Sequence, residues 1–469
     1  MEKKNNNKTI IIVVITVIVL IGCLCLSAAA LGVYFLNHRI DKNNEELIYE
    51  TAVPETSPED QTALPEVTPD NETDGTEINN TEITQKQQEI IKRAEKIRGL
   101  KAQGDFNITF LTKEELRDQL INDMYQDTTK QDFQDEHDIL TLLGFIPAEM
   151  DLESFYLDFY TEQIAGYYDE DANVMYLIKG GSETDNSLTL AHEYTHFLQF
   201  DHFNPAKTLN YNDEYCEKNQ EYCFVLGSVF EGDATLTEML LAAQPDLGLY
   251  DERMVEQDTS VFDNAPQYFQ NYLLFPYTYG FDFVSSVYRN GGFSAVNDLY
   301  SNPPLSAEQI MHPEKYSADQ PVNVLFEPFQ KNLDESCDLV YDNVLNEADL
   351  LWLLNSGYEK SWRISDKSAK KAAAGWGGGA FQFARCDGKP MFFGKTVWDT
   401  VNDAKEFSQS LKDYNDKRWG KSKINGSWTG TDGEQIYVSV QDDKVFYMIA
   451  PAEFSPDSLI DLIETGQGL

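Results

Sequence analysis

Basic residues are scarce in this chain of 469 amino acids. It contains 36 lysines and arginines but 79 aspartates and glutamates, so its formal net charge at pH 7 is −43. A surface that binds nucleic acid needs clustered lysine and arginine to displace the counterions around phosphate groups. The composition therefore argues against nucleic acid as a partner, and the acidic excess mainly favours solubility of the folded part.

Histidine is also rare, with only six residues in the chain. His192, Glu193 and His196 form the pattern H-E-x-x-H, which would arise by chance in only about one chain in a hundred of this composition. On a helix the two histidines lie one turn apart on the same face, so both imidazoles can reach one tetrahedral metal ion. Glu193 stands beside them, where it can take a proton from a water molecule that the metal activates. The pattern resembles the active-site helix of zinc metallopeptidases.

The residues around this motif favour a buried helix over a solvated one. We expect the helix to begin near Asp185 or Ser187, both good N-caps, and to end near Phe203, before Asn204-Pro205. The alternative is a pair of solvated histidines on the polar face of an amphipathic helix. Apolar side chains surround the motif, at Leu188, Leu190, Ala191, Tyr194, Phe197 and Leu198. Buried polar groups need partners, and a metal ion would supply one for the histidines.

The N-terminal part of the chain contains little that could join a folded core. Residues 1–8 are a short basic tail, and residues 9–36 are nearly all apolar and long enough to span a bilayer with some tilt. The lysines of the tail predict a cytoplasmic N-terminus and a single-pass protein of the cell membrane. Residues 37–87 are rich in Thr, Glu, Pro, Asn and Asp, which predicts a disordered stalk.

A second interpretation of this anchor is a lipoprotein signal. Leu20-Ile21-Gly22-Cys23 resembles the motif at which Cys23 would be lipidated and become the new N-terminus. Further apolar residues follow Cys23, where a mature lipoprotein turns polar, so we favour the uncleaved anchor. Both interpretations place the rest of the chain outside the cytoplasm.

Two histidines leave a zinc ion short of a third protein ligand, and two residues compete for this role. His202 follows His196 by six residues, as in the metzincin class, but that class needs a glycine midway for a sharp turn, and this chain has Gln199 there. Glu231 lies in an apolar helical pattern, where an unpaired carboxylate would be costly. A glutamate from a following helix is the third ligand of the gluzincin class, which this arrangement resembles. We therefore favour Glu231.

Further residues are needed to orient the ligand histidines by hydrogen bonds. Asp233 and Thr235 follow Glu231 closely and are candidates for this role. Gluzincins often have an aspartate four residues after the metal glutamate, whereas this chain has Thr235 at that position. The identity of the orienting residue therefore stays open.

Strand signals precede the motif helix. Asn107–Leu111 predicts a short strand, and two β-rich runs, 163–169 and 174–178, flank a cluster of turn residues and predict a hairpin. The exposed edge of such a hairpin could pair with an extended peptide and align it over the metal, although an ordinary structural hairpin would look the same in sequence.

Beyond the metal ligands, a peptidase needs a donor for the oxyanion that develops in the reaction. His312, Tyr277 and Tyr279 are candidates, and each could equally have a structural role. The H-E-Y-T-H helix, the E-G-D-A sequence at 231–234 and the segments 275–281 and 303–316 resemble a group of largely uncharacterised bacterial membrane-anchored proteins with metallopeptidase motifs. The resemblance covers residues 110–316. It implies a zinc-dependent, peptidase-like fold and identifies no substrate.

The last part of the chain, residues 321–469, predicts a helix followed by a small α+β domain. We expect a helix at 347–371, strands at 381–384 and 391–393, a helix at 397–414, a hairpin at 436–440 and 445–448, and a last helix at 456–464. The glycine-rich sequence 375–379 lacks the lysine and the serine or threonine of a phosphate-binding loop, so it predicts a tight turn with a packed tryptophan.

The six cysteines are consistent with an exported protein. Two lie in the apolar anchor. Cys216 and Cys223 flank a polar loop and predict a disulfide, with free thiols as the alternative, while Cys337 and Cys386 are isolated in the sequence.

Together these features predict an α+β chain in which residues 88–320 form a mainly helical, zincin-like metallopeptidase domain with a small edge hairpin. We expect one Zn²⁺ on His192, His196 and Glu231, with Glu193 as general base and His312 and Tyr279 assisting. The substrate would be a peptide or protein outside the cytoplasm. Two alternatives stay open: an inactive relative that serves as an extracellular binding scaffold, and a zinc hydrolase of a non-peptide substrate.

Overall fold

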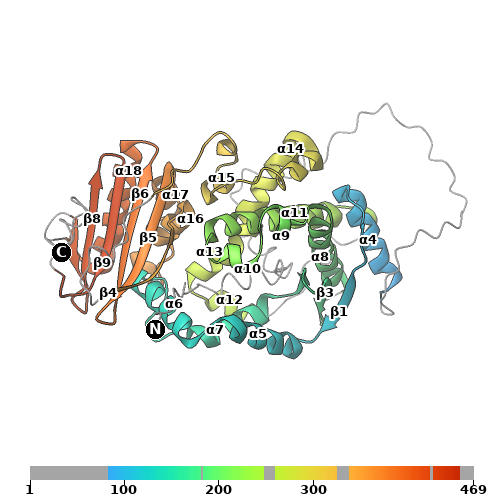
Figure 1. Ribbon diagram of the computed structural model, residues 1–469, viewed down its shortest axis with the longest axis horizontal. Coiled ribbons are helices and arrows are strands. Elements are labelled where there is room, and N and C mark those ends of the chain that lie inside the picture. The colour runs from blue at the N-terminus through green and yellow to red at the C-terminus, as the bar shows by residue number, and fades with distance from the viewer. Residues whose placement is uncertain (1–82, 181–182, 248–258, 325–336, 423–425, 455–469) are drawn as a thin grey trace, which may run out of the picture.

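The computed structural model describes residues 83–180, 183–247, 259–324, 337–422 and 426–454. A mainly helical region and a six-stranded sheet occupy opposite ends of the molecule, with α16 and α17 between them (Figure 1). This arrangement confirms the mixed α+β class. The predicted anchor at 9–36, most of the predicted stalk and the last predicted helix lie outside the described residues. Among the helices of the described ranges, none combines the length and hydropathy that a membrane crossing requires.

The helical region precedes the sheet in the chain. Its elements are α4 (Gln85–Arg98), β1 (Asn107–Leu111), α5 (Lys113–Asp127), α6 (Lys130–Leu143), α7 (Leu152–Gln163), β2 (Gly166–Asp169), β3 (Val174–Ile178), α8 (Glu183–Phe203), α9 (Pro205–Thr208), α10 (Asp213–Cys216), α11 (Gln220–Ala242), η1 (Pro245–Leu247), α12 (Ser260–Asn264), α13 (Gln267–Phe275), the π-helix η2 (Pro276–Gly280), α14 (Phe281–Asp298), α15 (Ala307–Met311) and η3 (Pro313–Lys315).

A three-stranded sheet in the order β1-β3-β2 lies beside α8. Strands β2 and β3 form the predicted antiparallel hairpin, and β1 pairs with β3 in parallel. Asn173 ends the hairpin turn with a φ of 53°, a left-handed conformation that asparagine tolerates better than most residues. The strand and the hairpin predicted from the sequence are both confirmed. Because β3 is central, β2 is an edge strand of this sheet.

Helix α8 carries the H-E-x-x-H motif and is buried from Ser187 to Gln199. It begins at Glu183, so the predicted N-caps were wrong: the polar residues before the motif add another turn to the same helix. The predicted end at Phe203 is confirmed. There Asn204 adopts a φ of 46° and Pro205 opens α9, which stops α8. The apolar side of α8 shares one hydrophobic cluster with α4, the small sheet and the end of α11.

Helix α11 packs along α8 on one side and against η2 and α14 on the other. Two glycines permit this second contact. A Cβ atom on Gly232 of α11 would overlap the carbonyl oxygen of Gly280, and one on Gly280 would overlap the carbonyl oxygen of Ser228. The backbones of α11 and η2 therefore touch directly, and this close approach brings the π-helix up to the buried core of the helical region.

The C-terminal region is built on an antiparallel sheet in the order β4-β5-β6-β9-β8-β7. Its elements are β4 (Cys337–Val344), α16 (Glu347–Asn355), η5 (Lys360–Trp362), α17 (Asp366–Ala373), β5 (Trp376–Cys386), β6 (Lys389–Trp398), α18 (Val401–Trp419), β7 (Ser427–Thr429), β8 (Gln435–Gln441) and β9 (Lys444–Ala450). Helix α18 packs against β6, β8 and β9. The predicted hairpin of β8 and β9 is confirmed.

Several predictions for this region were wrong in detail. The helix expected at 347–371 is divided into α16 and α17, because the chain turns away at Ser356 and Gly357. The helix expected at 397–414 begins at Val401, since Val397 and Trp398 belong to β6. Strand β4 was not anticipated, and the predicted strands at 381–384 and 391–393 are the central parts of the longer strands β5 and β6.

The glycine-rich sequence is a strand, not the tight turn that was predicted. The chain turns at Gly375, with a φ of 84°, and β5 begins at Trp376. A Cβ atom on Gly378 would overlap the carbonyl oxygen of Val322, and one on Gly379 would overlap that of Leu345. These glycines therefore permit β5 to contact the backbone of two segments that lie outside the strands of the sheet. The packed tryptophan is confirmed: the indole of Trp376 is buried and donates a hydrogen bond to the Leu345 carbonyl.

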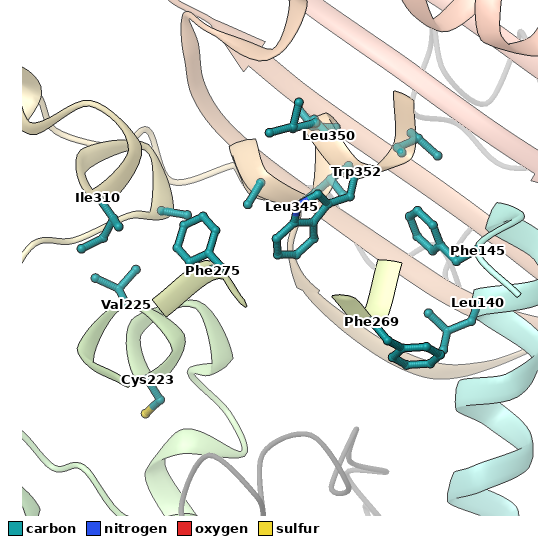
Figure 2. Packing of buried hydrophobic residues seen from close by; sticks show 14 of the residues in the cluster. Leu140, Phe145, Cys223, Val225, Phe269, Phe275, Ile310, Leu345, Leu350 and Trp352 are labelled. Atoms are coloured by element: carbon teal, nitrogen blue, oxygen red, sulfur yellow. The ribbon is translucent and has the colours of Figure 1, made fainter. Parts of the chain in front are cut away.

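One hydrophobic cluster runs from the helical region into the C-terminal region. Trp352 of α16 lies among residues from both, with its ring 5.9 Å from that of Phe275. Figure 2 shows Trp352 between Phe275 and Phe269, with Leu345 and Leu350 beside it. Helix α16 therefore packs against α13, the helix that leads directly into the π-helix η2.

Two disulfides are present among the described residues. Cys216 and Cys223 are joined, which confirms the predicted bond at the start of α11. Cys337 and Cys386 form the second, and treating them as isolated was wrong. They are direct cross-strand partners of β4 and β5. Without β4, nothing in the sequence placed them side by side.

Candidate metal centre

Three predicted ligands converge in the buried space between α8 and α11. The ligand atoms of His192, His196 and Glu231 all lie within 4.8 Å of one another. Glu231 Oε2 is 3.0 Å from His192 Nε2 and 3.7 Å from His196 Nε2. The two histidines are fully buried and Glu231 is 6% exposed. Glu231 thus brings its carboxylate to the two histidines although it is 35 or more positions from them in the sequence.

The donor set fits a zinc ion. Two imidazole nitrogens and one carboxylate oxygen are ligands that zinc prefers, with a further position left for water or substrate. In the described part of the chain, His196 Nε2 is buried and has no hydrogen-bond partner. A buried nitrogen without a partner is costly, and a metal ion would satisfy it.

The close approach of these three side chains also shifts their pKa values. Burial alone would lower the pKa of His192, but its hydrogen bonds to Glu231 and Glu238 outweigh burial and raise the pKa to about 10. Burial would raise the pKa of Glu231, but the adjacent His196 and His192 lower it to about 2. Burial lowers the pKa of His196. The carboxylate is therefore held ionised between the two histidines.

A second carboxylate contacts the other side of His192. Glu238 Oε2 lies 3.1 Å from His192 Nδ1. Glu238 follows Glu231 by seven residues on α11, two helical turns that place both acids on one face. Sequence reasoning missed Glu238, although a second acid seven residues on in an apolar helix was a usable signal. Thr235, the position considered instead, has a buried hydroxyl without a hydrogen-bond partner in the described residues.

The second histidine is held by an amide. Gln199 Oε1 lies 2.9 Å from His196 Nδ1, and Gln199 Nε2 donates to the Phe230 carbonyl and to Asp233. Gln199 entered the sequence argument only as the residue standing where a glycine would be needed. Asp233, expected to orient a ligand histidine, contacts Gln199 instead and so reaches His196 through it.

Glu193 and His202 lie in different parts of α8: Glu193 is beside the first ligand histidine and His202 is at the end of the helix. Glu193 is fully buried and lies next to His192 in the same turn. His202 is in the last turn of the helix, where its Nε2 is 2.6 Å from the Lys101 carbonyl and its Nδ1 is 2.9 Å from Gln103. His202 does not belong to the group of converging ligands.

Of the three candidate oxyanion donors, Tyr277 is the one with a described contact to the histidines. Its ring lies 6.2 Å from that of His192, and it is 2% exposed. Tyr279 packs against Phe275 and under the ammonium group of Lys370. Residues two positions apart on a helix do not face the same way, so η2 turns Tyr279 to a different side from Tyr277.

His312 lies at the C-terminal end of α15, and its Nε2 is 2.9 Å from Glu347 Oε1. Glu347 is the first residue of α16, so this pair joins the helical region to the C-terminal region. The hydrogen bond to Glu347 raises the pKa of His312. No contact described for His312 involves the three converging ligands.

A second acidic group lies near this junction. Carboxylate oxygens of Glu308, Asp319 and Asp399 also approach one another closely. The ammonium group of Lys315 sits among them, 2.6 Å from Glu308, 3.3 Å from Asp319 and 2.8 Å from Asp399. This group is an ion-pair cluster with its own cation.

Comparison with known proteins reaches only the C-terminal region. Residues 338–459 match a family described as "Domain of unknown function (DUF8575)". No curated protein and no solved structure matches the chain. The matched segment begins after α15 and contains none of the three converging ligands.

Proposed function

We propose that this chain is a zinc-dependent peptidase of the gluzincin type, with a zincin-like helical region. The observation that carries the proposal is the buried convergence of His192, His196 and Glu231. Two imidazoles and a carboxylate from consecutive long helices are the donor set that such enzymes use for zinc. The resemblance of the surrounding motifs to those of largely uncharacterised bacterial membrane-anchored proteins with metallopeptidase motifs supports the same assignment.

Each side chain has a role that follows from its chemistry. His192, His196 and Glu231 would hold the zinc ion, which when bound lowers the pKa of a water molecule to about 7 and polarises a carbonyl oxygen. Glu193 takes the proton of the attacking water and passes it to the leaving amine. Tyr277, beside His192, takes the place of Tyr279 as donor to the oxyanion.

A peptide is favoured as substrate because an edge strand lies beside the motif helix. Gly166, the first residue of β2, passes so close to Thr189 of α8 that a Cβ atom would lie 2.7 Å from its methyl group. Thr189 precedes His192 by three residues. An extended peptide pairing with β2 would therefore run along the helix that carries the histidines.

The predicted anchor at residues 9–36 would hold the enzyme on the outer side of the cell membrane. The two disulfides support this location, because such bonds form and persist outside the reducing cytosol. The substrate would then be a peptide or protein outside the cytoplasm.

The test is metal-dependent cleavage by the full-length chain in detergent, using a mixture of unstructured peptides and a panel of esters. We expect peptide cleavage that stops on chelation and returns with zinc. Glu193→Gln should lower the rate by about 10²- to 10⁴-fold because the general base is lost, while zinc stays bound. Glu149→Gln, an exposed glutamate after α6, is the control and should cleave at the wild-type rate.

The outcomes separate the three functions. Cleavage of esters alone would favour a zinc hydrolase of a non-peptide substrate. Proteolysis at the wild-type rate in Glu193→Gln would refute the mechanism. An absence of metal-dependent cleavage in a zinc-loaded chain would favour a binding scaffold.

A further inference from the structure

A chain of buried hydrogen bonds leads away from His196 through three further side chains. His196 Nδ1 lies 2.9 Å from Gln199 Oε1, and Gln199 Nε2 donates to Asp233 Oδ2 at 3.2 Å. Asp233 in turn pairs with Arg98, whose Nε is 2.8 Å from Asp233 Oδ1. The side chains of Arg98 and Asp233 are both fully buried. The series thus connects α8, α11 and the last residue of α4.

The partners of Gln199 decide which way its amide faces. Its Nε2 lies 3.0 Å from the Phe230 carbonyl and 3.2 Å from the Asp233 carboxylate, and both groups only accept hydrogen bonds. The amide nitrogen must therefore point to them, and the amide oxygen must point to His196. An oxygen accepts only, so His196 Nδ1 carries the proton. Its Nε2 is then left with the lone pair, on the side where Glu231 lies.

Arg98 supplies the counter-charge for the buried carboxylate of Asp233. Without it, the buried carboxylate would be strongly destabilising. The guanidinium donates to Asp233 from both Nε and Nη2, and Nη1 donates to Asn297 at 2.7 Å. Tyr300 adds a hydroxyl that donates to Asp233 Oδ2 at 2.7 Å. Asp233 is thereby fixed with an oxygen aimed at Gln199.

We propose that Gln199, Asp233 and Arg98 are positioning residues that set the tautomer of His196 before a metal ion arrives. The inference rests on the proposed function, because it assigns these residues to a zinc site. It also gives α4 a role that the motif alone does not suggest. This helix begins at Gln85, so the predicted stalk was drawn about three residues too long, and its last residue reaches His196 through two intervening side chains.

The primary test is the zinc dissociation constant of the full-length chain in detergent, measured by competition with a chelating dye. Gln199→Met keeps the length of the side chain and removes its hydrogen bonds. We expect about 10-fold weaker zinc binding, since residues that orient ligand histidines typically contribute that much. Thr237→Val is the matched control. Thr237 lies on α11 and is buried like Gln199, but its hydroxyl has no hydrogen-bond partner in the described residues. This variant should bind zinc within about twofold of wild type.

A second measurement reports the tautomer without any metal. The chain has only six histidines, so ¹⁵N-histidine labelling gives a small set of imidazole signals. The metal-free wild type should show His196 with its proton on Nδ1, and Gln199→Met should show a mixture of tautomers. A merely structural role of Gln199 would change stability and leave this signature unchanged.

Asp233→Asn and Arg98→Lys test the remaining residues of the series. The first keeps the size of the side chain and the second keeps its charge, and both weaken the hydrogen bonding that fixes Gln199. Both should bind zinc more weakly than wild type and more tightly than Gln199→Met. Wild-type affinity and an unchanged tautomer in Gln199→Met would overturn the proposal, and wild-type affinity in Asp233→Asn would remove Asp233 and Arg98 from it. If the wild type bound no zinc, the proposed function would fail, while the His196 tautomer would still decide whether the hydrogen-bond chain acts as described.

Discussion

Glu136 of α6 allows a quantitative prediction about stability. Its carboxylate accepts a hydrogen bond from the Tyr156 hydroxyl at 2.6 Å and is 3% exposed. Burial raises the pKa of Glu136 from 4.5 to about 7, despite the opposing effect of the Tyr156 hydrogen bond. The folded protein therefore holds this proton more tightly than the unfolded chain does. The stabilisation is fully present below pH 4.5 and is lost as the pH rises through 7.

The size of the effect follows from the two pKa values. The difference between about 7 and 4.5 corresponds to about 3 kcal/mol in the free energy of unfolding. Glu136→Gln removes the titration and keeps an oxygen that can accept from Tyr156. We expect the variant to match the wild type within about 1 kcal/mol near pH 4 and to be about 3 kcal/mol more stable at pH 8.

Urea unfolding of the full-length chain at a series of pH values measures this difference. Burial also raises the pKa values of Glu221 and Asp349 to about 7. These groups titrate in the wild type and the variant alike, so their contributions cancel in the comparison. Glu149→Gln, at an exposed position, is the control for the glutamate-to-glutamine change itself. A constant difference between Glu136→Gln and wild type across the pH range, or a less stable variant at pH 8, would refute the reasoning.

Two further predictions concern the metal centre. Glu238→Met removes the carboxylate 3.1 Å from His192 Nδ1 and should weaken zinc binding by about 10- to 100-fold, as chelator competition would measure; unchanged affinity would show that Glu238 does not orient His192. If the Tyr277 hydroxyl stabilises the oxyanion, Tyr277→Phe should lower kcat by about 10²-fold and leave the zinc content unchanged. Tyr279→Phe should retain wild-type kcat, because Tyr279 packs against Phe275. The reverse pattern would assign the donor to Tyr279.

Local signals predicted much of the helical region. The end of α8 was predictable because Asn204 and Pro205 stop a helix by their backbone preferences alone. The hairpin of β2 and β3 was predictable from two β-rich runs around a turn. The Cys216–Cys223 disulfide required only that a short loop close on itself.

The parts that failed depend on contacts between distant segments. Only Cys337 of β4 is buried, and the apolar and polar residues of this strand do not alternate, so its pairing with β5 and the Cys337–Cys386 bond could not be read from the sequence. The glycines of β5 looked like turn residues, and only their close contact with other backbones explains them. In both cases the deciding partner lies far away in the chain.

The candidate site shows the same division. His192 and His196 were predictable because helical spacing alone puts them on one face, and Glu231 because an acid in an apolar helical pattern needs a partner. Glu238 and Gln199 were missed as orienting residues because their partners become visible only when α8 and α11 are packed together. Nothing in the sequence was a ground for choosing between Tyr277 and Tyr279, because the contact of Tyr277 with His192 depends on how η2 packs against the helices that carry the ligands.

The most direct test of the account is the zinc content of the purified full-length chain, measured by elemental mass spectrometry beside Glu231→Ala and His202→Ala. His202 is the matched comparison because it is a histidine of the same helix that contacts Lys101 and Gln103 instead of the converging ligands. We predict one zinc per chain in the wild type and in His202→Ala, and none in Glu231→Ala. Loss of zinc in His202→Ala alone, or a well-folded wild type without zinc, would contradict the proposed metal centre.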